Sequence, residues 1–339
     1  MVIINVYGKI PKTLISDKLK IYISNIPDDW KEEIIEDVLK EVRQQKFNIL
    51  EDEKRYGKTH KSDYSLSYFQ KIVKENIKGY TKNNIDSIEN CIQCLVDNMI
   101  HLYFDYEYSD MHFFDWSSNC FDGRFCEEDY AEKVINFINF IHHDFPNEIH
   151  IDTVYSSNND HLHQSIILFK LGFKINTGFN HLKTQSESIA KLVSTGKKID
   201  NYINSETDYY KFDYILNSIY KDNDYNQNHF FKTYSLLELT LLEPYQRTSE
   251  VDNLLVPYLN KKYGNESTNV AKTLRQMRNK IGHGDFKGFN NKSEEFAQKY
   301  IKHYSFDYSE YSRLNWILLY TCCLLDDLLR NILFKQLTN

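Results

Sequence analysis

Apolar and polar positions follow different patterns in the two parts of the chain. In the first part, several runs alternate between apolar and polar residues or are rich in β-branched and aromatic residues, which predicts strands; these runs are residues 2–8, 19–23, 101–108 and 149–155. Between them, apolar residues recur at helical spacing over residues 30–42, 87–100 and 130–143. The pattern predicts a mixed domain of strands and helices.

The strand patterns stop after His181, and the rest of the chain follows a helical period. Six stretches place apolar residues three or four positions apart; they are residues 187–203, 209–220, 228–243, 250–263, 268–282 and 311–337. A chain of 339 residues also exceeds the size at which one core usually divides. We therefore expect an α+β N-terminal domain over residues 1–183 and an all-α helical bundle over residues 184–339.

Composition narrows the classes of function. The chain is 41% apolar and 26% charged, as in a folded globular protein, and its net charge of −7 provides no overall attraction to nucleic acid. RNA binding would therefore need a local basic surface. The longest apolar run, residues 316–325, is too short to span a bilayer, and residues 1–10 lack the pattern of a signal peptide. These features predict a cytoplasmic protein without membrane contact.

Neither the cysteines nor the histidines form a pattern typical of a metal site. Cys91 and Cys94 make one CxxC pair, without the second pair that a zinc site requires. The stretch that contains "HLH" has a helical pattern, in which residues two apart do not share a face. We expect structural or solvated roles, and no metal or other cofactor, for the five clustered histidines of the first domain: His142, His143, His150, His161 and His163.

Two stretches place an arginine five residues before a histidine. They are "RYGKTH", from Arg55 to His60, and "RNKIGH", from Arg278 to His283. If four to six intervening residues are allowed, chance alone produces roughly one Arg–His pair in a chain with this many arginines and histidines, so the spacing carries little information. The surroundings of Arg55 lack an apolar period and are typical of a loop, whereas Arg278 lies in a predicted helix.

In that helix, one apolar stripe defines the direction of the other side chains. At about 100° per residue, the stripe fills a sector about 60° wide and consists of Val270, Leu274, Met277 and Ile281. His283 points away from the stripe and shares its face with Asn279, while Arg278 stands at the edge of that face. Lys272 and Arg275 lie on the same side of the helix. A core role for His283 is therefore disfavoured.

A helix end is the structural explanation for the same residues. Gly284 suits the C′ position that follows a helix, and the helix dipole favours a histidine at this end. This explanation and a catalytic role for His283 are compatible.

The stretch "LRQMRNKIGHGDF", residues 274–286, resembles the signature of the HEPN superfamily, in which an arginine and a polar residue precede a histidine near a helix end. The resemblance covers about 150 helical residues, 186–339, and implies catalytic roles for Arg278, Asn279 and His283. It also implies an acidic residue from an upstream helix, for which Glu238 is the match. An internal salt bridge is the alternative role for Glu238. The family further implies a homodimer in which two such motifs face each other.

These residue types suit cleavage of RNA without a metal. A histidine can donate or accept a proton near neutral pH, and an arginine presents a planar charged fork to phosphate oxygens. Asp285 is the only acidic residue close to His283, so there are too few carboxylate ligands for a mechanism that uses two metal ions. We expect a metal-independent endoribonuclease in which the RNA 2′-hydroxyl attacks, with Lys272 and Arg275 binding the RNA backbone. The resemblance implies a toxin or phage-defence effector, which an antitoxin or regulatory partner would restrain.

The first domain contains a looser resemblance. "SSNNDHLHQSIILFKLGF", residues 156–173, resembles the last helix and strand of the GNAT acyltransferases, but the glycine-rich loop that cradles a pyrophosphate has no counterpart upstream. This implies a degenerate GNAT-like sensor or specificity domain. Two alternatives to the ribonuclease remain: a non-catalytic HEPN module that binds nucleotide or protein, and an acyltransferase-like enzyme of the first domain.

Overall fold

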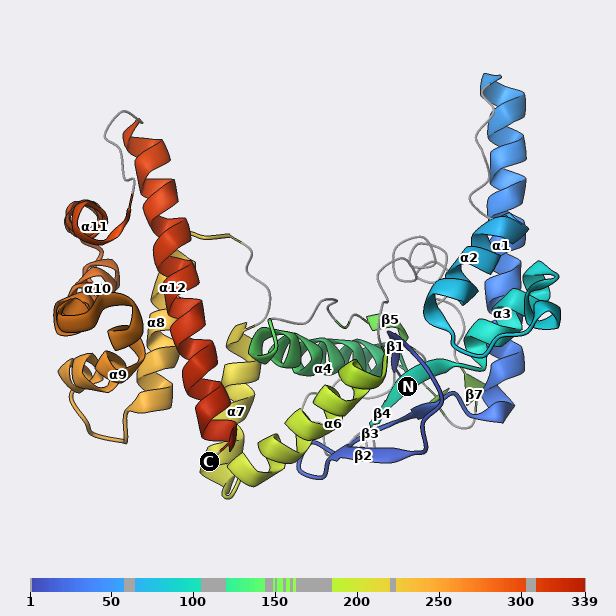
Figure 1. Cartoon of the computed structure of the whole chain (residues 1–339), viewed down its shortest axis with the longest axis horizontal. Coiled ribbons are helices and arrows are strands. Elements are labelled where there is room, and N and C mark those ends of the chain that lie inside the picture. The colour runs from blue at the N-terminus through green and yellow to red at the C-terminus, as the bar shows by residue number, and fades with distance from the viewer. Residues whose placement is uncertain are drawn as a thin grey trace. The chain divides into compact units, whose positions relative to one another are not determined.

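The computed structural model describes most of the chain, in segments separated by gaps. The described residues are 2–57, 65–104, 120–143, 149, 151–154, 157–158, 161–162, 185–219, 224–302 and 309–338. They form two compact units, Met1–Ile203 and Asn204–Asn339. The first unit contains an antiparallel sheet with helices, and the second unit is helical (Figure 1). The expected order, a mixed α and β region followed by a helical region, is confirmed.

The sheet of the first unit has five strands in the order β2-β3-β4-β1-β5. Its strands are β1 (Val2–Tyr7), β2 (Thr13–Ser16), β3 (Ile21–Asn25), β4 (Met99–Phe104) and β5 (Ile151–Val154). Each neighbouring pair is antiparallel. Four of these strands coincide with predicted runs. The pattern analysis missed β2, which spans four residues and is too short to show a period.

Three helices of the first unit enclose a hydrophobic core beside the sheet. They are α1 (Asp28–Tyr56), α2 (Leu66–Asn76) and α3 (Ile88–Val96). Their apolar faces meet in one buried cluster that includes Ile34, Phe69 and Ile92. The burial of these side chains supplies the main driving force for this part of the fold.

Among the described residues, two further α-helices belong to the first unit: α4 (Cys120–Ile141) and α6 (Gln185–Tyr202). The helix α6 packs against β2, and a Cβ on Gly196 would lie within 2.3 Å of Ile15 atoms. Asp200 of α6 accepts hydrogen bonds from the Ser16 hydroxyl and the Asp17 backbone N–H. The units thus divide at residues 203 and 204, whereas the sequence placed the boundary after residue 183 and assigned this helix to the second domain.

The described part of the second unit consists of α-helices and two short 3-10 helices. The α-helices are α7 (Glu206–Ile219), α8 (Gln227–Leu241), α9 (Val251–Tyr263), α10 (Ser267–Gly282), α11 (Phe286–Tyr300) and α12 (Glu310–Thr338). The helix α10 packs against α8, α9 and α11, and α12 packs along α8 (Figure 1). Five of the six helices coincide with predicted stretches. The pattern analysis missed α11, although Phe289, Phe296 and Ala297 form a buried stripe at helical spacing.

The apolar run in α12 is a core element of the second unit. Ile317, Leu318, Leu324 and Leu325 are buried there. Within the part of the chain that the structure describes, no helix is both long and apolar enough to cross a membrane.

Candidate functional site

The helix α10 buries three of the four residues of its expected apolar stripe, while Ile281 is half-buried, and the opposite side is accessible. Val270, Leu274 and Met277 are fully buried. On the other side, Lys272 and His283 are exposed, and Asn279 is half-buried. Arg278 is half-buried at the edge, where its side chain is 21% exposed. The helical wheel therefore placed these side chains correctly.

A Schellman turn holds His283 at the end of α10. His283 is the C-cap residue, and Gly284 follows with φ 71°, a left-handed conformation that a glycine adopts without strain. The Gly284 N–H donates to the Ile281 carbonyl at 2.9 Å, and the Asp285 N–H donates to the Lys280 carbonyl at 2.8 Å. The helix-end explanation of this stretch is confirmed.

The next helix begins at once, and hydrogen bonds connect the two helices at this corner. The Asp285 carboxylate accepts from the Gly288 backbone N–H at 2.8 Å, which caps α11, and from the Lys280 ammonium at 2.6 Å. The backbone N–H of His283 donates to the Asn279 carbonyl at 3.0 Å. His283 thus extends from a hydrogen-bonded corner between two helices, a suitable support for a group that must keep a fixed position.

Arg278 contacts the acidic residue that the resemblance assigned to its pocket. Its guanidinium forms an ion pair with the Glu238 carboxylate of α8, although 40 residues separate them along the chain. Glu238 is only 8% exposed. The same guanidinium lies over the ring of Phe231, 5.6 Å from the ring centroid, and donates to the Asn279 side-chain oxygen at 3.1 Å.

Several polar atoms around this ion pair are buried without a hydrogen-bond partner among the described residues. They are the Glu238 Oε1, the Arg278 Nε and the Tyr234 hydroxyl. Burial raises the pKa of Tyr234, so this hydroxyl stays protonated at neutral pH. Buried polar atoms normally have partners, and exceptions often occur at functional positions or where a water binds. The ion pair therefore retains unused hydrogen-bonding capacity on both of its members.

The sequence analysis missed the aromatic wall of this site. Phe231, Tyr234 and Glu238 lie on one face of α8, at positions i, i+3 and i+7. This spacing in the sequence could have indicated that the two aromatic side chains lie beside Glu238. A Cβ on Gly282 would lie 3.3 Å from the Phe231 ring, so the glycine allows α10 and α8 to pack closely beside the motif.

The two expected RNA-binding residues differ in their surroundings. Arg275 makes a bidentate ion pair with Asp252 of α9, with nitrogen–oxygen distances of 2.9 to 3.0 Å, and its side chain is 18% exposed. This pairing engages the guanidinium within the unit, and it gives Arg275 a role in joining α9 to α10. Lys272 is exposed and makes no ion pair with any residue that the structure describes.

The other Arg–His stretch, from Arg55 to His60, lies in different structural surroundings. Arg55 lies in the last turn of α1, where it is 68% exposed and 3.7 Å from Glu51. The expectation of a loop at Arg55 is wrong, because α1 continues to Tyr56 and ends at Gly57. His60 lies outside the described residues.

The histidine cluster and the GNAT-like stretch fall largely outside the described residues. The Nε2 atom of His142 lies 2.7 Å from the Thr195 hydroxyl. His161 belongs to a two-residue strand, β7 (His161–Leu162), which pairs with β6 (Ser157–Asn158), so a helix is wrong at this position. His150 and His163 are not described. Among the described residues, no group of three or more acidic, histidine or cysteine side chains could hold a metal ion.

A second buried polar pair in the helical unit escaped the sequence analysis. The Nε2 atom of His229 in α8 lies 3.0 Å from both carboxylate oxygens of Asp326 in α12, and Thr233 donates to the same carboxylate at 3.2 Å. These interactions connect two helices that pack along each other, which is a structural role.

Comparison with known proteins does not assign a family. No family model matches the chain, and no curated protein or solved structure is detectably similar to it.

Proposed function

We propose that the protein is a metal-independent endoribonuclease whose catalytic groups lie at the end of α10. One observation carries the proposal: the buried Glu238 pairs with Arg278, while His283 extends from the same helix into solvent. An imidazole can transfer the protons of RNA transesterification, and a guanidinium held by a carboxylate can stabilise the charge that develops on the phosphate. The resemblance of residues 274–286 to the HEPN signature supports the same conclusion, as does the helical character of the unit.

Each group has a defined task in the proposed reaction. The RNA 2′-oxygen attacks the adjacent phosphorus, and the bond from phosphorus to the 5′-oxygen breaks. A histidine accepts the proton from the 2′-hydroxyl, and a protonated histidine donates a proton to the leaving 5′-oxygen. Arg278 offers its guanidinium to the negative charge that develops on the phosphate oxygens, and Asn279 and Glu238 hold that guanidinium in place.

One motif supplies too few groups for this reaction. Two proton transfers occur on opposite sides of the phosphate, and the helical unit carries one His283. We propose a homodimer in which two copies of α10 face each other across the RNA, so that one histidine acts as base and the other as acid. The exposed position of His283 permits such an approach.

The biological role in this proposal is that of a toxin or phage-defence effector in the cytoplasm. A ribonuclease of this kind damages its own cell unless a separate antitoxin or regulatory partner restrains it. The α+β unit would then select the target or receive the signal. A non-catalytic HEPN module would instead use the Arg278–Glu238 pair only as an internal salt bridge.

Incubation of the purified full chain with single-stranded RNA in EDTA tests the proposal. We expect cleavage that persists in EDTA and leaves 2′,3′-cyclic phosphate ends, because the attacking group belongs to the RNA. A 2′-O-methyl group at a mapped cut site should stop cleavage at that site. Intact RNA would reject the ribonuclease and favour the non-catalytic module, and normal cleavage of the methylated site would reject the mechanism.

A further inference from the structure

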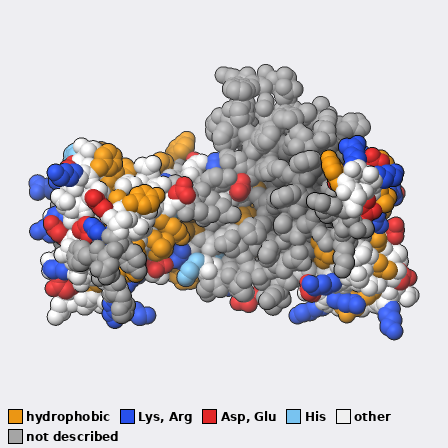
Figure 2. Space-filling model, turned by 90° about the horizontal axis from the view of Figure 1, so that it is seen from above, with side chains coloured by type: hydrophobic (Ala, Val, Ile, Leu, Met, Phe, Trp, Pro, Cys, Tyr) orange, Lys and Arg blue, Asp and Glu red, His pale blue; other side chains and the backbone are white. Residues whose placement is uncertain are grey.

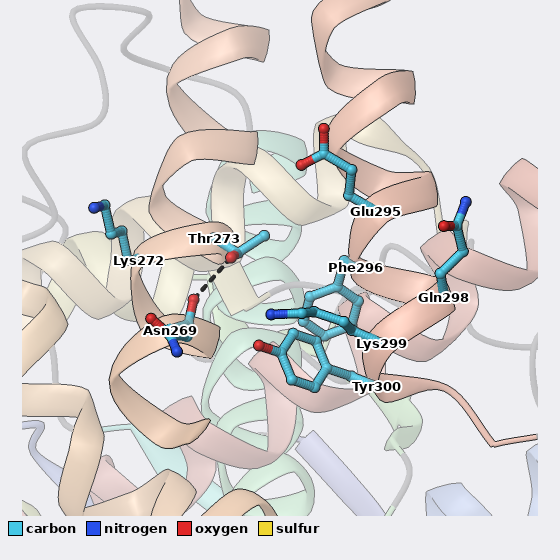
Figure 3. A pocket seen from close by; sticks show the side chains of 8 residues that line it. All are labelled: Asn269, Lys272, Thr273, Glu295, Phe296, Gln298, Lys299 and Tyr300. Carbon is cyan, nitrogen blue, oxygen red and sulfur yellow. Dashed lines mark hydrogen bonds between the residues drawn. The ribbon is translucent and has the colours of Figure 1, made fainter. Parts of the chain in front are cut away.

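A pocket of about 430 Å³ opens between the first half of α10 and the second half of α11 (Figure 3). The Lys299 ammonium and the Tyr300 hydroxyl point from α11 toward α10 across this space. Phe296 is fully buried and forms part of the wall. Asn269, Lys272, Thr273, Glu295, Phe296, Gln298, Lys299 and Tyr300 line the pocket.

The pocket has two accessible cations. Lys272 is exposed and has no ion-pair partner among the described residues. Lys299 is 67% exposed, lies 3.9 Å from a Glu266 carboxylate oxygen and stands 5.7 Å from the centroid of the Tyr300 ring. Such an exposed pair contributes little energy and leaves the ammonium available to a ligand. Gln298 also lines the pocket, and its side-chain amide can donate hydrogen bonds to a ligand.

The acidic residues at the pocket already have partners. Glu295 forms an ion pair with Lys292, one turn earlier on α11. Glu266 accepts hydrogen bonds from the Tyr300 hydroxyl at 3.0 Å and from the Asn269 amide at 3.1 Å. These contacts lower the pKa of Glu266 and spread its charge over several donors. The surface of the unit mixes basic and acidic side chains (Figure 2), and at this pocket the two exposed lysines are the groups that can attract an anion.

The pocket lies on the same face of α10 as the proposed catalytic histidine. Lys272 and His283 are separated by eleven residues, which corresponds to about 20° around the helix and about 16 Å along it. Asn279 lies between them on that face. A single strand of RNA that passes His283 and follows this face of α10 therefore reaches the pocket within a few nucleotides.

We propose that this pocket is a subsite for the phosphodiester backbone of single-stranded RNA, outside the cut site, in which Lys272 and Lys299 pair with phosphate. This inference rests on the proposed ribonuclease function, and it adds Lys299 and the other pocket-lining residues of α11 to the proposed RNA-binding surface. The donors of the pocket are flexible cations and an amide, so it selects phosphate without reading the base. It gives the enzyme affinity for the strand and no sequence preference.

Binding of a fluorescent 2′-O-methyl RNA to the full chain tests this subsite, because the protein cannot cleave that probe by the proposed route. Fluorescence anisotropy is measured over a series of salt concentrations for Lys272→Ala, Lys299→Ala and the double variant. Loss of one phosphate contact to a single strand should reduce the salt slope by about 0.7 and weaken binding about 5-fold at 0.1 M salt, and the double variant should weaken it about 25-fold. Lys335→Ala is the matched control, since Lys335 is an exposed lysine of α12 outside the pocket.

The outcomes separate the subsite from the ribonuclease. Two results would overturn the subsite even if the enzyme cleaves RNA. In the first, both lysine variants bind the probe with the affinity and salt slope of the wild type; in the second, they lose no more affinity than Lys335→Ala. Failure of the wild-type chain to bind the probe would also overturn it. Losses of affinity and salt slope that are confined to the two lysine variants support the subsite. They support it even if the wild-type protein leaves ordinary RNA intact, because that result would reject only the ribonuclease.

Discussion

Replacement of Arg278 by alanine should weaken the fold as well as abolish activity. The helical wheel alone predicts near-native melting for Arg278→Ala, because the side chain points away from the apolar stripe. The structure changes this expectation, because Arg278 is the ion-pair partner of Glu238, whose side chain is only 10% exposed. Without the guanidinium, a buried carboxylate loses the charge that compensates its desolvation.

The magnitude follows from the burial of the two side chains. Breaking a buried ion pair by removing one partner costs about 3–5 kcal/mol. Because the Arg278 side chain is 21% exposed, water can partly replace it, so we expect the lower end, about 3 kcal/mol. For a helical unit that spans Asn204–Asn339, this loss corresponds to a fall in melting temperature of about 10 °C.

Thermal unfolding of the full chain, followed by far-UV circular dichroism, measures this effect. His283→Ala is the matched control, because it removes an exposed side chain and should change the free energy of unfolding by less than about 0.5 kcal/mol. Replacing both Arg278 and Glu238 with methionine should recover much of the stability, because no charge is then left unpaired. If Arg278→Ala and His283→Ala have the same melting temperature, the contact between Arg278 and Glu238 does not stabilise the fold, and the reasoning from burial is wrong.

Three further predictions concern activity, independent folding and pH. In an RNA cleavage assay, His283→Ala should lose about 10²–10⁴-fold in rate, while Arg55→Ala stays within a few-fold of wild type; equal losses would remove the reason to prefer the second Arg–His stretch. A fragment of residues 204–339 should fold alone as a helical dimer in sedimentation, since its core is self-contained, and a monomer at micromolar concentration would contradict the facing motifs. Burial lowers the pKa of His101 in β4 from 6.5 to about 4, with a smaller effect of the N-terminal charge. The folded state thus favours the neutral form of His101. The free energy of unfolding is unaffected by His101 above pH 6.5, and it falls by about 3 kcal/mol in total as the pH drops toward 4, because protonation of His101 then favours the unfolded state. Urea unfolding at pH 7 and pH 4.5 should show a smaller loss for His101→Gln than for wild type, and equal losses would exclude His101 as the cause.

The sequence by itself determined the properties that depend on near neighbours along the chain. Val270, Leu274 and Met277 recur at helical spacing, so the buried side of α10 and the exposed position of His283 were both predictable. The end of α10 just before Gly284 was also predictable, because the left-handed conformation after a helix is a local preference of glycine. Most strands and helices followed in the same way from their period.

The tertiary structure decided which partner each polar side chain has, and of these partners only Glu238 was expected, from the family resemblance of residues 274–286. Arg275 and Arg278 lie three residues apart on one helix, yet the first pairs with Asp252 of α9 and the second with Glu238 of α8. The period of α6 likewise predicted a helix but not that Gly196 would pack on Ile15 of the sheet, which places that helix in the first unit. A period reports which side of a helix is apolar, whereas the element that covers this side depends on how the whole chain packs, and residues distant in sequence decide it.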